Sequence, residues 1–188
     1  SPIPSSGKRV TRLGINFGAP GDRKADDDTL WLDYPSVGGP SPDVPLALSG
    51  DQIEYARQHA SLVPSKLLPW VFASGVRGVR HLRLRLASRE EAGDSTGTYA
   101  VRLYWRHVDP ADLQGPQTAL RLQGQPPGGN CRVLAQPDPA SGCVVQQWDD
   151  VTMGEFLELD LATPPPPPPD PARPRPLLCG IELLKTEH

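Results

Sequence analysis

The chain has 188 residues, of which 24 are proline and 18 are glycine, and its formal net charge is −3. This length is enough for one domain with a buried core. The negative charge gives no basic field to attract nucleic acid or an anionic membrane, and no apolar run reaches the about 18 residues of a membrane-spanning helix. We therefore expect no nucleic-acid partner and no membrane insertion, and we see no signal peptide.

The amino-terminal part predicts one strand followed by a long loop. Residues 1–9 are expected to form a tail, and the weakly alternating segment 10–18 predicts the first strand. Residues 19–50 combine many Gly, Pro and Asp residues with two large aromatic residues, Trp31 and Tyr34. This composition predicts an irregular loop that carries recognition residues.

The segment 50–63 predicts one short helix, because Asp51 can cap its first turn. Alternating residues farther on predict strands at 80–88 and 98–108, which present apolar side chains to one face and polar side chains to the other. The inward residues are Leu82, Leu84, Leu86, Val101, Leu103 and Trp105, and the outward residues are His81, Arg83, Arg85, Arg102, Tyr104 and Arg106. Further strands are predicted at 118–125, 143–151, 155–163 and 177–185.

Many short strands separated by turns, with almost no helix, predict an all-β fold. We expect a jelly-roll-like antiparallel β-sandwich over residues 10–185, with long loops and at most one or two short helices. Residues 164–176 would form a Pro-rich loop, and residues 186–188 a tail. The excess of arginine and proline is typical of a GC-rich genome, and we therefore expect a bacterial module.

Opposite charges on different strands are positioned to pair. Arg83, Arg85 and Arg102 can meet Glu158, Asp160 and Glu182, which would help to set strand pairing and register. The arginine stripe is therefore interpreted as a solvated sheet face, with a phosphate-binding stripe as the alternative.

Four aspartates occur within residues 22–28, among them Asp26 and Asp28. Carboxylate oxygens are ligands that Ca²⁺ prefers, so one interpretation is a structural calcium site. The other is a solvated acidic loop that Arg23 and Lys24 partly neutralise. We expect no other cofactor.

Two of the three cysteines flank a segment that could fold back as a hairpin. Cys131 and Cys143 are therefore interpreted either as a small-loop disulfide or as two ordinary buried thiols. Cys179 lies in an apolar segment and is expected in the core.

Each of the remaining tryptophans could either pack in the core or contact a ligand. Trp70 and Trp105 are expected to pack in or at the edge of the core, whereas Trp148 precedes two aspartates and could contact a ligand at a loop rim. The sequence has no G-x-S-x-G elbow, no paired histidines and no carboxylate pair that stands out, so we expect no enzymatic activity.

Several segments, in this order, resemble malectin and malectin-like domains. The segment GINFG resembles their opening strand, GTYAVRLYW their hairpin strand, TALRLQGQ and CVVQQWDDVTMGEFLELDLA later strands, and PLLCGIELL their last strand. The SVGGPSP segment is similar to malectin-like domains of large secreted planctomycete proteins. The resemblance implies a jelly-roll-like sandwich that binds carbohydrate through loops, with Trp31 near an aromatic contact. Two contacts of the family are replaced here, by Asp109 and Pro110 and by Pro174.

Two functions follow as hypotheses. The first is a non-catalytic carbohydrate-binding module of a larger exported protein, located outside the cell, in the periplasm or at the cell surface. Its partners would be an oligo- or polysaccharide and neighbouring domains. Trp31 and Tyr34 would stack on the sugar, Asp33 would hydrogen-bond it, and Trp148 would be a further contact. The second is a structural or protein–protein interaction module, expected if Trp31 and Tyr34 pack under the loop.

Overall fold

The computed structural model describes residues 12–18, 23–24, 29–34, 46–57, 69–86, 97–106, 120–122, 131–135, 144–154, 156–161 and 177–186. These residues form strands and one short helix. The amino-terminal elements are β1 (Arg12–Phe17), β2 (Arg23–Lys24), β3 (Leu30–Tyr34), β4 (Leu46–Arg57), α1 (Pro69–Phe72) and β5 (Ser74–Arg85). They are followed by β6 (Gly97–Arg106), β7 (Leu120–Leu122), β8 (Cys131–Ala135), β9 (Val144–Met153), β10 (Phe156–Leu161) and β11 (Leu177–Lys185).

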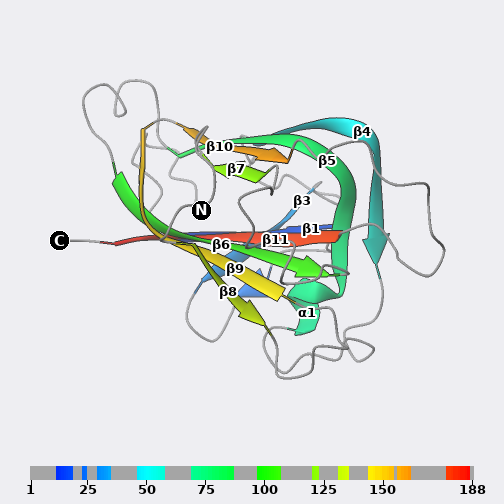
Figure 1. Ribbon diagram of the computed structural model, residues 1–188. Coiled ribbons are helices and arrows are strands. Elements are labelled where there is room, and N and C mark those ends of the chain that lie inside the picture. The colour runs from blue at the N-terminus through cyan, green and yellow to red at the C-terminus, as the bar shows by residue number, and fades with distance from the viewer. Residues whose placement is uncertain are drawn as a thin grey trace.

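The strands make two layers, which confirms the predicted all-β sandwich (Figure 1). The larger layer has the strand order β8–β9–β6–β11–β1–β3–β2, and the smaller has the order β4–β5–β10–β7. The strongly curved β5 joins them, since its Val76 pairs with Leu178 of β11 while its later residues pair with β10. Most neighbours are antiparallel, but β1 and β3 run parallel, so the larger sheet is mixed and not wholly antiparallel as predicted.

Alternating leucines fill the space between the layers, as the sequence predicts. Leu82, Leu84 and Leu86 are fully buried, while Arg83 and Arg85 on the opposite face of β5 are exposed. Trp105, expected in the core, is also buried in this cluster. Burial of these side chains from both sheets supplies the main hydrophobic stabilisation of the sandwich.

Two predictions about the first third of the chain are wrong. The predicted loop 19–50 contains β2, β3 and the start of β4. The end of β4 lies where the predicted helix within 50–63 would begin. Strand β4 pairs with β5 along most of its length, and this tertiary pairing overrides a weak helical pattern. Within the described residues the helix is α1, and no helix there is both long and apolar enough to cross a membrane.

Candidate functional site

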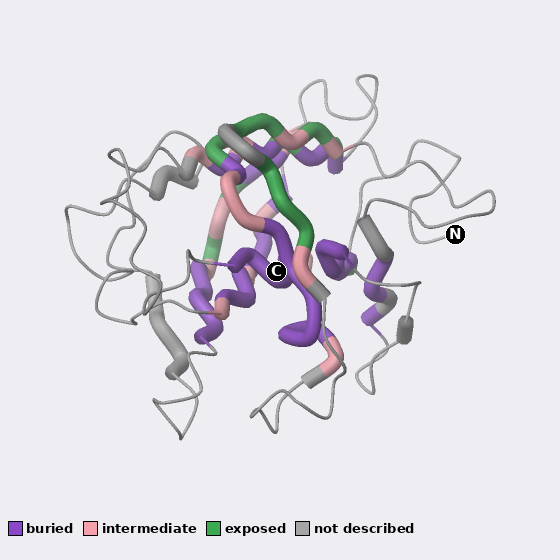
Figure 2. The backbone as a smooth tube through the Cα atoms, turned by 90° about the vertical axis from the view of Figure 1, so that its right-hand side faces the viewer, coloured by how far each residue is buried: buried purple, intermediate pink, exposed green. Residues whose placement is uncertain are grey.

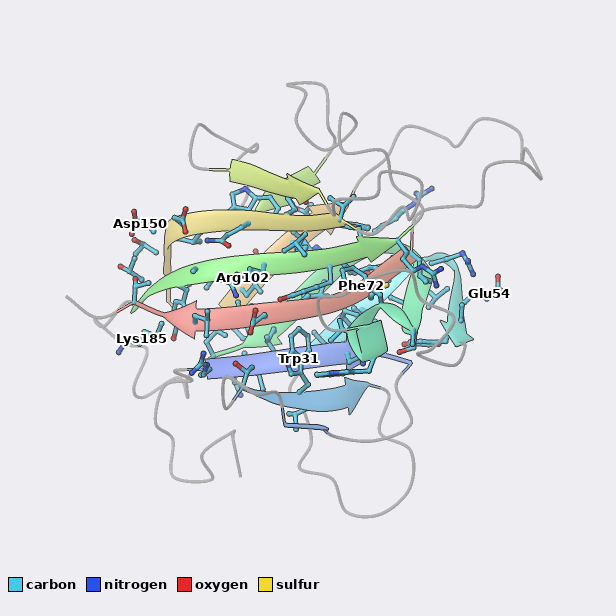
Figure 3. All side chains as sticks on the ribbon, turned by 90° about the horizontal axis from the view of Figure 1, so that it is seen from below. Trp31, Glu54, Phe72, Arg102, Asp150 and Lys185 are labelled. Atoms are coloured by element: carbon cyan, nitrogen blue, oxygen red, sulfur yellow. The ribbon has the colours of Figure 1, made fainter. Side chains whose placement is uncertain are left out.

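The outer face of the larger sheet carries a second, mainly aromatic cluster. Helix α1 lies against this face (Figure 3), and its Val71 and Phe72 pack with Trp31 and Tyr104 from the strands. Tyr104 was predicted to point outward from the core, and it does, but the face is covered there and the side chain is buried. The outer face is therefore a packed surface at one end.

Trp31 lies over two glycines of neighbouring strands. A Cβ added at Gly14 would fall 2.7 Å from Cε2 of Trp31, and one at Gly180 would fall 2.9 Å from Cζ3. Both glycines belong to segments that resemble malectin-like domains, GINFG and PLLCGIELL. Any side chain at these positions would displace the indole, so the two glycines create the space that Trp31 fills.

Edge-to-face contacts connect the rings of this cluster. The Trp31 ring meets Trp70 with centroids 5.8 Å apart and Tyr104 with centroids 5.3 Å apart, and Phe72 meets Tyr104 at 5.6 Å. Trp31 is 1% exposed, whereas Trp70 is partly exposed. Trp70 is therefore the ring of this cluster that is partly exposed to solvent.

Helix α1 is tied to the sheet by a buried polar link. The side-chain amide of Asn16 on β1 donates to the carbonyl oxygen of Trp70 (3.3 Å), and the Ser74 hydroxyl donates to Oδ1 of Asn16 (3.2 Å). Because Asn16 and Ser74 are both buried, breaking this link would leave unsatisfied polar groups. The link fixes the position of Trp70 relative to the sheet.

A single row of paired residues crosses all the strands of the larger sheet. Its members, from one edge to the other, are Arg23, Trp31, Gly14, Glu182, Arg102, Gln147 and Arg132. Directly paired residues share one face of a sheet, so the described side chains of this row, Trp31, Glu182, Arg102 and Gln147, lie on the outer face. The aromatic cluster and the charged residues of this face are thus neighbours.

Hydrogen bonds join the central residues of the row. Nε of Arg102 donates to Oε1 of Gln147 (2.9 Å), and Nη1 of Arg102 donates to Oε1 of Glu182 (3.0 Å). The Tyr104 hydroxyl donates to the same Glu182 oxygen (2.9 Å), which connects the polar network to the aromatic cluster. Gln147 in turn donates to Asp149 (2.8 Å).

Burial and charge shift the ionisation of this network. Burial raises the pKa of Tyr104 far above its ordinary value, and the negative charge of Glu182 and the hydrogen bond to it raise that pKa further. Burial lowers the pKa of Arg102, but the Glu182 charge and hydrogen bond more than offset this and leave that pKa raised. Arg102 therefore stays a cation and Tyr104 a neutral phenol at any physiological pH.

Two predicted aromatic contacts lie in packed positions. Trp31 is on strand β3 and not in a loop, and its indole has no open face on which a sugar could stack. Trp148 is on β9, is 4% exposed and belongs to the core between the sheets, on the opposite side from the aromatic cluster. Burial of Trp31 is the arrangement that the sequence analysis associated with a structural or interaction module.

The structure describes the other predicted site residues only in part. Asp33 and Tyr34 lie on β3, paired with Asn16 and Phe17, but their side chains are outside the described part of the structure, so their ligand contacts stay predictions. Asp26 and Asp28 are outside the described residues altogether, so the calcium interpretation is also still a prediction. Among the residues the structure does describe, no group of three or more His, Cys, Asp or Glu side chains could hold a metal.

The proposed disulfide lies outside the part of the chain that the structure describes. Cys143 and the side chain of Cys131 are not among the described residues, so both interpretations of this pair stay predictions. Cys179 is buried, as predicted.

The predicted cross-strand charge pairs are largely confirmed. Arg83 meets Glu158 (3.3 Å) on the outer face of the smaller sheet, and Arg102 meets Glu182 on the larger sheet. Asp160 pairs with His81 (2.6 Å) and not with an arginine. The arginine stripe on β5 is therefore a paired, solvated face, as interpreted.

Sequence reasoning missed the features that organise the outer face of the larger sheet. It did not identify Gly14 and Gly180 as the floor under Trp31, Trp70 as the open ring, or Glu182 as a buried carboxylate. Glycine inside a strand pattern signals close approach of another group, so the two glycines were a usable sign. The burial of Glu182 had no such sign, because alternation places it on a polar face.

Comparisons with known proteins add a distant likeness. No protein family model matches the chain, and no curated protein matches it, so the resemblance to malectin-like domains stays a prediction from the motifs. The structure is similar to the crystal structure of the ANX2 ectodomain from Arabidopsis thaliana, with a TM-score of 0.43 and 11% sequence identity. The match covers 94% of this chain and 42% of that one, so the chain spans less than half of the length of that ectodomain. A likeness this distant says nothing about what the chain binds.

Proposed function

We propose that this chain is a non-catalytic carbohydrate-binding module of a larger exported protein, and that it binds glycan on the outer face of the larger sheet. The ligand would lie beside α1, where Trp70 offers a partly open ring and Arg102 offers hydrogen-bond donors. The proposal includes no enzymatic activity, no cofactor, no nucleic acid and no membrane insertion. It assigns the module to the extracellular space, the periplasm or the cell surface.

One observation carries the proposal: a partly exposed tryptophan and a polar network adjoin on one sheet face, and both are held in place. Trp70 is fixed by the Asn16 link, and Arg102 is fixed by hydrogen bonds to the strands on either side. Sugar binding needs a flat apolar ring next to oriented polar groups, and a preorganised set lowers the entropic cost of binding. This assignment moves the expected aromatic contact from Trp31 to Trp70.

A second function is favoured by a different surface. Ile53 and Tyr55 are the large hydrophobic residues that the described structure leaves exposed, at 38% and 40%, and both lie on β4. Residues 53–55 of this strand are exposed in succession, and Figure 2 draws this part of the backbone as exposed. Such residues suit contact with a neighbouring domain, which is the structural or interaction role. Replacing both with serine would then weaken binding of the adjoining domain, measured by calorimetry with the separated domains.

The experiment for the main proposal is calorimetric titration of the chain with a panel of neutral oligosaccharides. We expect weak but measurable binding that falls about tenfold in Trp70→Ala, because loss of a stacking contact of about 1.4 kcal/mol has that effect. Tyr55→Ala is the matched control, since it removes an exposed aromatic residue from a different surface. Absence of binding across the panel, or equal losses in both variants, would contradict the proposal.

A further inference from the structure

We infer that Tyr104 is a positioning residue of the proposed glycan site, because it orients both Trp70 and Arg102 without contacting the sugar itself. This inference rests on the proposed function, in which Trp70 and Arg102 are the groups that contact the ligand. It assigns a role in recognition to a residue that the sequence analysis interpreted only as an outward-facing strand residue.

Tyr104 is closed to a ligand, since it is only 2% exposed. It lies on β6 two residues from Arg102, and residues two apart along a strand point to the same face of a sheet. The Arg102 side chain, by contrast, is 32% exposed. Any effect of Tyr104 on binding must therefore pass through its more exposed neighbours on this face.

The hydroxyl of Tyr104 acts on Arg102 through a shared oxygen atom. It donates to Oε1 of Glu182 (2.9 Å), and Nη1 of Arg102 donates to the same oxygen (3.0 Å). Hydrogen bonds to a carboxylate are among the stronger ones and are directional. The Tyr104 bond thus fixes the carboxylate that the guanidinium meets, and the bond from Nε of Arg102 to Gln147 (2.9 Å) completes the orientation.

The ring of Tyr104 acts on Trp70 through the aromatic cluster. Tyr104 meets Phe72 with ring centroids 5.6 Å apart, and Phe72 belongs to the same four-residue helix as Trp70. Tyr104 also meets Trp31 at 5.3 Å, and the Trp31 ring meets Trp70 at 5.8 Å. Edge-to-face pairs are directional contacts, so the Tyr104 ring helps to hold α1 in place. One side chain therefore supports both halves of the proposed site, by different chemistry.

The two roles can be separated with Tyr104→Phe, which keeps the ring and removes only the hydroxyl. The helix and Trp70 should stay in place, whereas Arg102 should lose part of its orientation. Tyr99→Phe is the matched control, because Tyr99 is a fully buried tyrosine of the same strand that packs in the core between the two sheets.

The test is calorimetric titration of these variants and the wild type with cello-, malto- and xylo-oligosaccharides. We expect Tyr104→Phe to lower the affinity about threefold, in keeping with the net worth of one hydrogen bond, and Tyr99→Phe to leave it unchanged. In an Arg102→Met background, Tyr104→Phe should have no further effect, because the group that it orients is gone. In a Trp70→Ala background, the loss of about threefold should persist.

A second measurement needs neither a ligand nor the Arg102 variant. The Nε–H proton of Arg102, which is bonded to Gln147, should exchange with solvent several times faster in Tyr104→Phe than in the wild type, as measured by NMR. Tyr99→Phe should leave this exchange rate unchanged.

The outcomes separate this inference from the proposed function. An unchanged affinity in Tyr104→Phe, an equal loss with and without Arg102, or an unchanged Nε–H exchange rate would overturn the positioning role and leave a carbohydrate-binding module. Absence of binding by the wild type would overturn the proposed function, and the role of Tyr104 in recognition with it.

Discussion

The outer faces of the two sheets begin from the same sequence pattern and end in different environments. On the smaller sheet, Arg83 and Glu158 pair in the open, and each is about half exposed. On the larger sheet, Arg102 and Glu182 pair in the same cross-strand manner, but Glu182 is fully buried beside an aromatic cluster and helix α1. The difference shows that alternation determines which way a side chain points, and that what covers the face determines what the side chain does.

The energetic consequences of that difference are large. An exposed ion pair contributes about 0–1 kcal/mol, because water solvates both charges well in its absence. A buried carboxylate that loses its partner is left with an uncompensated desolvation cost of several kcal/mol. The outer face of the larger sheet, here called the covered face, should therefore be sensitive to substitution. The outer face of the smaller sheet, here called the open face, should tolerate substitution.

The largest effect is expected at Gly14, against which the Trp31 ring packs on the outer face of the larger sheet. Gly14→Ala would force a methyl group into the Trp31 ring and should lower the free energy of unfolding by about 3 kcal/mol. Urea denaturation measures this directly. Gly154→Ala is the matched control, because nothing lies within 4 Å of the added Cβ. Similar stability of the two variants would show that Trp31 does not occupy the described position.

The two arginines provide the next comparison. Arg102→Met leaves Glu182 buried without its cation and should cost about 2–3 kcal/mol of stability. Arg83→Met leaves Glu158 in water and should cost less than about 1 kcal/mol. Equal values in denaturation experiments would mean that Glu182 is as well solvated as Glu158, and the distinction between the faces would be lost.

Alkaline pH tests the same network without removing a charge. The pKa of Tyr104 is raised in the folded state, so its stabilising effect is complete below the unfolded value of about 10 and is lost as pH rises above it. One pH unit above that value should cost about 1.4 kcal/mol. Thermal unfolding from pH 8 to pH 11 should therefore fall more steeply in the wild type than in Tyr104→Phe. Parallel curves would place the phenol in water.

The smallest effect is expected on the open face. Arg83 and Arg85 lie over the Phe156 ring, with Cζ 3.6 and 5.4 Å from its centroid. Phe156→Leu keeps the apolar bulk and removes the cation–π contact, which should cost about 0.5 kcal/mol in urea denaturation. A loss above 2 kcal/mol would indicate that this face is covered as well.

Much of the sandwich follows from local pattern. The alternating leucines of β5 and β10 identify the core, and charge complementarity correctly anticipates the Arg83–Glu158 and Arg102–Glu182 pairs. The alternation, and the charges that it places on one face, can be read within each strand, so a sequence is enough to find both signals.

The site could be predicted less well, because it depends on how distant segments cover a face. Trp31 sits in a polar, Pro-rich context that suggests a loop, yet parallel pairing with β1 makes it part of a strand. Its burial requires two glycines on other strands and a helix from residues 69–72. These are relationships among segments far apart in sequence, and no single segment carries their signature.

Hydrogen–deuterium exchange with the tightest-binding neutral oligosaccharide locates the bound ligand, because it reports both outer faces at once. We expect slower exchange in α1, in the Arg102 region of β6 and in the Glu182 region of β11, with no change in β5 and β10. Protection confined to β5 and β10, or no protection by any neutral sugar, would contradict recognition on the larger sheet.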